Sequence, residues 1–265
     1  LQEIVIILGG IDLSVGSIIA MSGVLGAATV VWGGMPEYVG IVVALLSGLL
    51  FGLFNGAVIA LTNIPPFIVT LASMNVAKGI AYVYSGGRPI RCMTAAWKFL
   101  GAGYVGPVPT PVITMTIVFI AAILILNRTR MGRHIYAVGG NEQSAALMGL
   151  PVGRTKILVY GFNGLCSVLA GISYALYVKS GWNLSLQGGE LEVITCAVIG
   201  GTLLTGGVGY MVGTLFGVLL KSVIPALITF NGNLLSWWGK IATGLLLLLF
   251  ICIQRFVVTS SSRRK

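Results

Sequence analysis

Residues 127–156 read NRTRMGRHIYAVGGNEQSAALMGLPVGRTK and form the one long polar insertion in an otherwise apolar chain. One acid, Glu142, stands in this stretch against five cations, which are Arg128, Arg130, Arg133, Arg154 and Lys156. Because cations of membrane proteins collect in cytoplasmic loops, the stretch is predicted to lie on the cytoplasmic side of a membrane. It would then separate two apolar halves of the chain.

The middle of this stretch has the signals of a short helix. Asn141 can cap the first free amides, and Glu142 meets the positive end of the helix dipole. Gly149 favours a C-terminal stop and Pro151 prevents continuation. A helix of about two turns is too short to span a bilayer. The residues alone leave two interpretations open, a surface offered to a soluble partner or a capped interfacial loop helix.

Composition predicts an all-α, polytopic membrane helix bundle. Hydrophobic residues make up 57% of the chain and charged residues 8%, with a mean hydropathy of +1.00, whereas ordinary soluble domains are about 25% charged. The net charge of +10 does not indicate nucleic-acid binding, because the cations cluster in 127–156 and in the tail SSSRRK. Four cysteines show no metal or redox spacing and are predicted to be small core residues.

Apolar segments alternate with short polar breaks along the chain. They are 1–8, 17–33, 38–62, 64–85, 111–126, 157–178, 192–206, 210–230 and 237–258. Several are shorter than the roughly 20 residues that span a bilayer, or contain Gly or Pro, as in broken or re-entrant helices. With 127–156 inside, the loop 86–110 is external and the C-terminus cytoplasmic. The opening LQEIVIIL resembles the end of a hydrophobic segment, so we expect the natural chain to begin earlier.

The chain is predicted to be one transmembrane domain, 1–265, with repeat halves of about 1–126 and 157–258. SGLLFGLFNGAVI around Gly48 is similar to VGTLFGVLLKSVI around Gly213. The predicted topology runs these copies in opposite directions, which indicates an inverted-topology repeat; chance similarity of Gly/Leu-rich segments is the alternative. Small residues at four-residue spacing predict close helix packing at Gly48, Gly52, Gly56, Gly209, Gly213 and Gly217.

Two glycine-rich breaks place acids at or near membrane depth. GGIDLSVGS at 9–17 contains Asp12 and Ser14, and GGELE at 188–192 contains Glu190. A charge there is costly, so Asp12 either lines a translocation path or caps a half-helix, with Ser14 adding a hydroxyl. Lys221 lies within an apolar segment and is either a path residue or a lysine that snorkels or pairs with Asp12 or Glu190.

Four stretches resemble a known family. GGIDLSVGS at 9–17, IPPFIVTLASMNVAKGIAY at 64–82, GRHIYAVGGNEQSAALMG at 132–149 and VIGGTLLTGGVGYMVGTLFG at 198–217 are similar to permease subunits of ATP-binding-cassette sugar importers. The resemblance covers essentially the whole chain and falls in the ribose and simple-sugar branch. The stretch ITFNGNLLSWWGKIATGLLLLLFICIQRF at 228–256 looks closest to the galactofuranose-type permease.

The resemblance implies a set of partners in the bacterial inner membrane. These are a second permease subunit, identical or different, membrane lipid, a cytoplasmic ATPase and a periplasmic sugar-binding protein. The segment 139–149 would be the coupling helix that docks into the ATPase. Because a tight contact needs small side chains, Gly139, Gly140, Ala145 and Ala146 are its candidate contact residues. Asn141 would cap the start of this helix, Glu142 would add a polar contact, and Gly149 would end the helix.

The sequence provides no energy source of its own. No G-x-x-x-x-G-K-[ST] phosphate loop occurs, since Leu234 stands where the first glycine before Gly239-Lys240 would be. One histidine, His134, and scattered acids predict no catalytic site, no metal site and no cofactor in this chain, with ATP and Mg on the partner ATPase. An ion-coupled secondary transporter is the alternative function, although Asp12 and Glu190 are few ligands for a coupling ion. A membrane-embedded enzyme ranks third.

Overall fold

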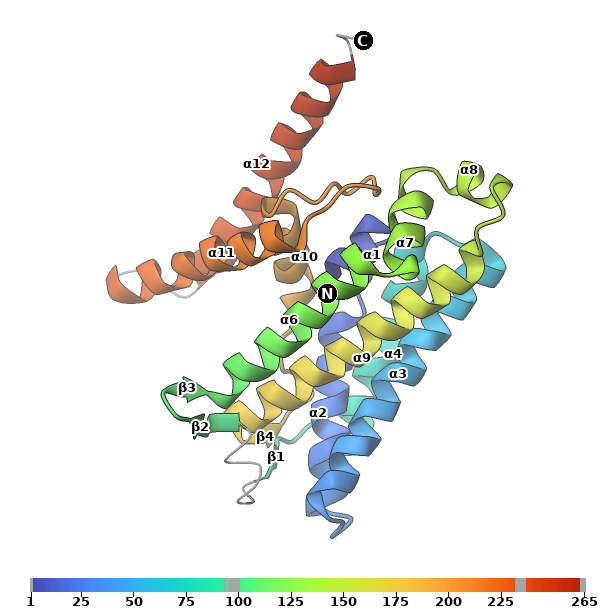
Figure 1. Ribbon diagram of the computed structural model, residues 1–265. Coiled ribbons are helices and arrows are strands. Elements are labelled where there is room, and N and C mark those ends of the chain that lie inside the picture. Colours follow the sequence, from blue (N-terminus) through green and yellow to red (C-terminus); the bar gives the residue numbers. More distant parts are fainter. Residues whose placement is uncertain (1, 93, 95–100, 232–236, 263–265) are drawn as a thin grey trace.

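The computed structural model describes residues 2–92, 94, 101–231 and 237–262, and it is built almost entirely of helices (Figure 1). The helices are α1 (Gln2–Ile7), α2 (Val15–Val31), α3 (Glu37–Thr62), α4 (Pro66–Ser85), α6 (Thr110–Arg128), α7 (Arg130–Gly140), α8 (Glu142–Leu147), α9 (Val152–Val178), α10 (Gly189–Ile199), α11 (Met211–Asn231) and α12 (Trp237–Ser262). Two small antiparallel sheets pair β1 (Ile90–Arg91) with β4 (Ser180–Gly181) and β2 (Tyr104–Val105) with β3 (Val108–Pro109).

Six of the described helices are long and apolar enough to cross a membrane. They are α3, α4, α6, α9, residues Met211–Ile228 of α11 and Trp237–Gln254 of α12. The prediction of an all-α polytopic bundle is thereby confirmed. The predicted segment 192–206 is too long, however, because α10 ends at Ile199 and Gly201, at φ +92°, continues as a turn. Cys252 is exposed on α12, so the prediction of a core position is wrong for this cysteine, whereas Cys92, Cys166 and Cys196 are buried.

Helix α3 lies directly against α9, and glycines make this approach possible (Figure 1). A Cβ atom added to Gly48 would lie 1.9 Å from Val168 Cγ2, and one added to Gly52 would lie 2.4 Å from the Tyr160 carbonyl oxygen. Both distances are far below van der Waals contact. The two backbones therefore touch, which is how helices pack when the surrounding lipid is as apolar as their side chains.

The second predicted glycine set packs on a different helix. Added Cβ atoms at Gly213 and Gly217 would each lie 2.0 Å from a carbonyl oxygen of α10 or its end, namely those of Gly200 and Cys196. Gly209 packs against Ile7 of α1. Figure 1 shows α11 and α12 extending away from the group formed by α2, α3 and α9. Their largely exposed apolar surfaces need an apolar environment.

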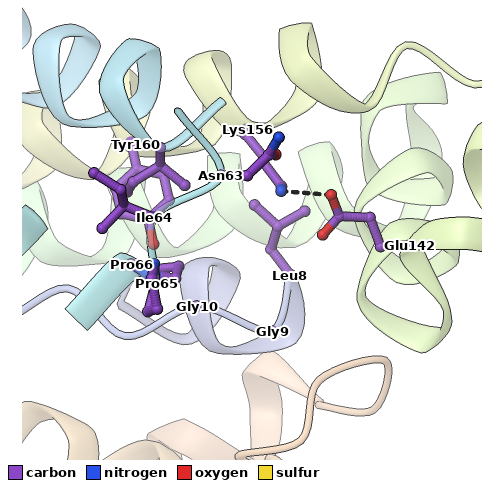
Figure 2. Close-up of a pocket in the computed structure, with 11 residues that line it drawn as sticks. Leu8, Gly9, Gly10, Asn63, Ile64, Pro65, Pro66, Glu142, Lys156 and Tyr160 are labelled. Atoms are coloured by element: carbon purple, nitrogen blue, oxygen red, sulfur yellow. Dashed lines mark hydrogen bonds and ion pairs between the residues drawn. The ribbon is translucent and has the colours of Figure 1, made fainter. Parts of the chain in front are cut away.

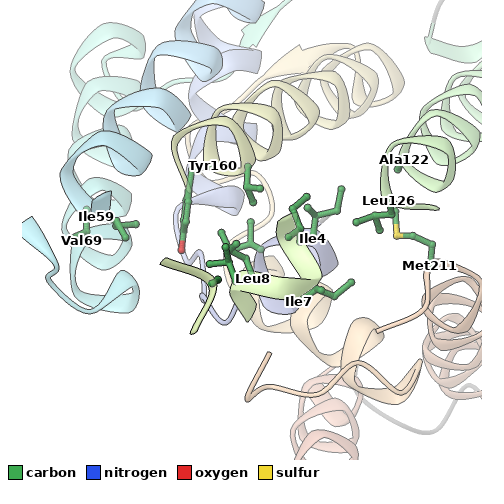
Figure 3. Packing of buried hydrophobic residues seen from close by; sticks show 14 residues of the cluster. Ile4, Ile7, Leu8, Ile59, Val69, Ala122, Leu126, Tyr160 and Met211 are labelled. Carbon is green, nitrogen blue, oxygen red and sulfur yellow. The ribbon is translucent and has the colours of Figure 1, made fainter. Parts of the chain in front are cut away.

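Helix α1 and the start of α2 are buried at the centre of the described structure. All six residues of α1 are buried, and Ile4 and Ile7 belong to a hydrophobic cluster that also contains Leu126, Tyr160 and Met211 (Figure 3). This cluster joins side chains from α1, α6, α9 and α11. The interruption between α1 and α2 is therefore largely held inside the protein, although Gly9 is exposed.

Candidate functional site

A buried polar cluster surrounds the interruption between α1 and α2. Helix α1 ends at Ile7, Gly9 adopts the left-handed conformation at φ +87°, and α2 begins at Val15. Asp12 lies between them and is only 1% exposed. The cluster consists of Gln2, Asp12, Ser14, Asn55 and Asn163, all of them buried.

The Asp12 carboxylate organises this cluster. Its Oδ1 accepts hydrogen bonds from the Ser14 backbone amide at 2.8 Å and from Ser14 Oγ at 2.5 Å. Its Oδ2 accepts from Asn163 Nδ2 at 2.9 Å. A buried charge of this kind is tolerated only when hydrogen bonds compensate for the lost water. The acid also stands just before α2, where the helix dipole favours negative charge.

Three amide side chains connect the cluster to other helices. Asn163 Nδ2 on α9 donates to Gln2 Oε1 on α1 at 3.1 Å, and Gln2 Nε2 donates to the Asp12 carbonyl at 2.9 Å. Asn55 Nδ2 on α3 donates to Ser14 Oγ at 3.1 Å. None of these amides was selected from the sequence. A single amide within an apolar helix is nevertheless a signal, because such groups join helices inside membranes.

Gln2 and Asn163 also line a cavity of about 360 Å³ bounded by α1, α2, α6, α9, α10 and α11. Ser167, Ser173 and Thr214 add hydroxyl groups to walls that are otherwise mainly apolar. Asp12 is absent from the residues that line this cavity, since it lies behind the two amides. This geometry favours the structural interpretation of Asp12, in which it holds the start of α2 and orients the amides.

The other predicted path residues are arranged differently from what the sequence suggested. Lys221 forms an ion pair with Glu192, so its predicted pairing with Asp12 or Glu190 is wrong. Glu190 instead approaches the first turn of α2, where a Cβ added to Gly16 would lie 2.6 Å from Glu190 Oε2. The structure thus brings Glu190 to the same helix start as Asp12 and Ser14, and it places Lys221 beside α10.

The polar stretch 127–156 contains two helices before α9 begins, whereas the sequence predicted one. Helix α8 has the predicted ends: Asn141 Oδ1 accepts from the Ser144 amide at 2.8 Å, and Gly149 adopts φ +78°. Helix α7 was missed. Thr129 caps it by accepting from the Gly132 amide at 3.2 Å, and it buries Ile135 and Val138. Gly139 and Gly140 therefore belong to the end of α7 and not to the short helix.

One residue predicted for partner docking faces the interior of the chain, and another packs partly against it. Ala145 is completely buried in the hydrophobic cluster that contains α1, and Gly139 lies against the Ile7 carbonyl. A partner cannot contact Ala145 without unfolding this region, so that assignment is corrected, whereas Gly139 is partly exposed and its docking role stays a prediction. The exposed surface of the segment runs over 140–144 and 146–149, and it includes Leu147 and Met148, whose exposed fractions are 90% and 70%.

An ion pair fixes α8 to α9. Lys156 Nζ lies 2.6 Å from Glu142 Oε1 at one side of a cavity of about 240 Å³, as Figure 2 shows. Gly9 and Gly10 line the same cavity, together with the loop between α3 and α4. Glu142 therefore has a partner within the chain. Within the described ranges, no group of His, Cys, Asp and Glu side chains has the arrangement of a metal site.

A bundle of long apolar helices around an interrupted, polar centre, with a short exposed helix outside it, is the architecture of a polytopic membrane transport subunit. The chain belongs to the family described as branched-chain amino acid transport system / permease component, whose model matches residues 3–251. It is a multi-pass membrane permease.

Curated relatives are similar over nearly the whole chain. The inner membrane ABC transporter permease protein YjfF of Escherichia coli K12 is 42% identical over 95% of this chain and 77% of its own length. The ribose import permease RbsC of Bacillus subtilis is 37% identical over 95% of this chain and 78% of its own length. The fructose import permease FruG of Bifidobacterium longum is 35% identical over 98% and 79%. No solved structure gives a significant match.

Proposed function

We propose that this chain is the transmembrane permease subunit of an ATP-driven importer that moves a simple sugar across the inner membrane. The observation that carries the proposal is the similarity, over at least 95% of the chain, to permeases named for ribose and fructose import. Within this class, the resemblance of residues 228–256 to galactofuranose-type permeases favours a furanose or another monosaccharide.

The energy comes from a cytoplasmic ATPase that binds ATP and Mg, and a periplasmic binding protein delivers the sugar. Leu147 and Met148 support this part of the proposal, because exposed apolar side chains at the end of a short surface helix are typical of a contact site. Asn141, Glu142, Gly140, Ala146 and Gly149 shape or flank the same exposed segment. With α7 and α8 on the cytoplasmic side, the C-terminus is cytoplasmic as well.

A second permease subunit completes the pore. The large exposed apolar surfaces of α11 and α12 support this assignment, because one chain leaves them without a protein partner among its described residues. Lipid covers the part that the second subunit leaves open. The inverted repeat of the halves 1–126 and 157–258 would place the path between them.

The polar cluster forms part of the translocation path in this proposal. Gln2 and Asn163 present amide groups to the cavity, and amides donate and accept hydrogen bonds as sugar hydroxyls require. Asp12 and Ser14 hold these amides in place. Glu190 packs against the start of α2, and Lys221 stabilises α10 through Glu192.

Reconstituted vesicles test the proposal. The chain would be co-expressed with the ATPase and binding protein encoded beside it, and uptake of labelled ribose, arabinose, fructose and galactofuranose would be measured with ATP supplied to the ATPase. We expect uptake that requires ATP and the binding protein, and no ATP hydrolysis by the permease alone. Uptake by the permease alone, driven by a sodium or proton gradient, would instead identify an ion-coupled secondary transporter.

A further inference from the structure

Three glycine-containing segments from distant parts of the chain meet at one point of the structure. They are Gly9 after α1, Gly139 at the end of α7, and Gly206 with Gly207 in the loop between α10 and α11. We call these four residues the glycine joint. It connects the helix beside α8 with both interruptions in the transmembrane region.

Backbone atoms make the contacts of the joint. The Gly207 amide donates to the Ile7 carbonyl at 2.8 Å. A Cβ added to Gly139 would lie 1.8 Å from the same carbonyl oxygen and 2.9 Å from the Gly207 nitrogen. One added to Gly206 would lie 2.7 Å from the Gly139 oxygen and 2.9 Å from Gly9 Cα. No flexible side chain stands between these segments to absorb a displacement.

Side chains reinforce the same connection. Tyr136 on α7 donates its hydroxyl to the Gly209 carbonyl at 2.8 Å, and Gly209 packs on Ile7. Thr202, in the loop after α10, donates to Glu3 Oε1 on α1 at 3.1 Å. Helix α7 is therefore attached both to α1 and to the loop that leads into α11.

Helix α1 links the joint to the polar cluster. Its six residues span about 9 Å, with Ile7 at the joint and Gln2 in the cluster. All six are buried, so α1 has no freedom to bend separately from its neighbours. The cavity of about 240 Å³ beside Gly9 and Gly10 provides space into which this segment can move (Figure 2).

We propose that the glycine joint, with Gly139 as its central positioning residue, transmits displacement of α7 and α8 to the ends of α1 and α10 and thereby to Gln2 and Asn163. This inference rests on the proposed function, because it requires an ATPase that moves α8. It goes beyond that function by naming the contact that carries the movement. Packed backbones shift as rigid units and suit such a role.

Gly139→Ala tests the proposal in the reconstituted assembly of permease, ATPase and binding protein. A carbon–oxygen contact needs about 3.3 Å, so the added methyl group, 1.8 Å from the Ile7 oxygen, would force the two backbones apart by about 1.5 Å. We expect normal membrane insertion and ATPase binding. Sugar transported per ATP hydrolysed should fall on the order of tenfold, within the usual range of coupling between sites.

Gly153→Ala is the matched control, because it makes the same change in a helix of the same polar stretch, where the nearest atom to the new Cβ is Ala60 Cβ at 3.9 Å. It should leave the sugar-to-ATP ratio unchanged. If Gly139→Ala retains the wild-type ratio, the joint does not transmit movement and the inference is overturned. The wild-type assembly separates the two proposals, since absence of sugar-stimulated ATP hydrolysis there contradicts the proposed function itself.

Tyr136→Phe gives a second, milder test that preserves the shape of the contact. It removes only the hydrogen bond to the Gly209 carbonyl, which lies outside the cavity residues. We expect a reduction of the sugar-to-ATP ratio of roughly fivefold, as for one lost hydrogen bond. Should Gly139→Ala fail to assemble, an unchanged ratio in Tyr136→Phe would overturn the inference.

Discussion

Replacement of Asn163 by leucine removes the amide that connects α9 to both α1 and the Asp12 carboxylate. Asn163 Nδ2 donates to Gln2 Oε1 at 3.1 Å and to Asp12 Oδ2 at 2.9 Å, and the residue is 2% exposed. Leucine has the same branched arrangement of side-chain heavy atoms and is somewhat larger, so the substitution leaves no cavity. Its main effect is to leave two buried acceptors without these donors.

The expected loss of stability depends on the charge of one of the two acceptors, the Asp12 carboxylate. Interhelical hydrogen bonds in membranes contribute about 0.6 kcal/mol on average. A buried group left without its partner costs about 1–3 kcal/mol, and more when it is charged. Asp12 keeps its two bonds from Ser14, which limits the loss. We therefore expect Asn163→Leu to lower the free energy of unfolding by about 3 kcal/mol.

Two measurements test this expectation on the purified permease and on the assembly. The first is the fraction of monodisperse protein after heating in detergent, and the second is ATP-dependent uptake of labelled sugar. Ser173→Ala is the control, because Ser173 lines the same cavity but donates only to the Leu169 carbonyl of its own helix at 2.8 Å. If Asn163→Leu behaves like Ser173→Ala in both measurements, the polar cluster neither stabilises the fold nor serves the path.

Three further predictions concern residues selected from the sequence. Ala145→Arg should lower the yield of folded permease because it places a charge in the protein's own core, whereas Ala146→Arg should preserve the yield and weaken ATPase co-purification. Asp12→Leu should lower the yield of folded protein more than the transport activity of each folded molecule, since it removes a carboxylate held by three hydrogen bonds. Full yield with no uptake would contradict this. Lys221→Met should lower thermal stability, because it leaves Glu192 without its cation beside the membrane-spanning part of α11, and unchanged stability would contradict this.

Features that depend only on residues nearby in the sequence were predictable. The ends of α8 follow from Asn141, Gly149 and Pro151, and each acts within a few residues of its own position. The glycine spacing of α3 indicated a packing face, but the identity of α9 as the partner depends on the tertiary fold. The same limit applies to the amides of the cluster, whose partners lie on different helices.

Rotation of a helix about its axis explains the errors in the predicted site. Glu190 and Glu192 are two positions apart on α10, so they point to different sides of the helix, and only the packing of α10 decides which one meets Lys221. Ala145 and Ala146 differ by one position on α8, yet one is buried and the other exposed. The pattern of a six-residue helix is too short to define its buried face.

Two breaks in the helices, between α1 and α2 and between α10 and α11, are structurally dependent on each other. Irregular backbone within a membrane protein is tolerated only where its polar groups are satisfied inside the protein. The amides of Gly9 and Gly10 donate to carbonyls within α1, and the amide of Gly207 donates to the Ile7 carbonyl of the other break. Each break thus provides part of the environment that the other requires. A displacement that separates the two breaks would expose buried backbone groups, so we expect the breaks to move together. This favours one coordinated opening of the central region over independent motion of the two segments that contain the breaks.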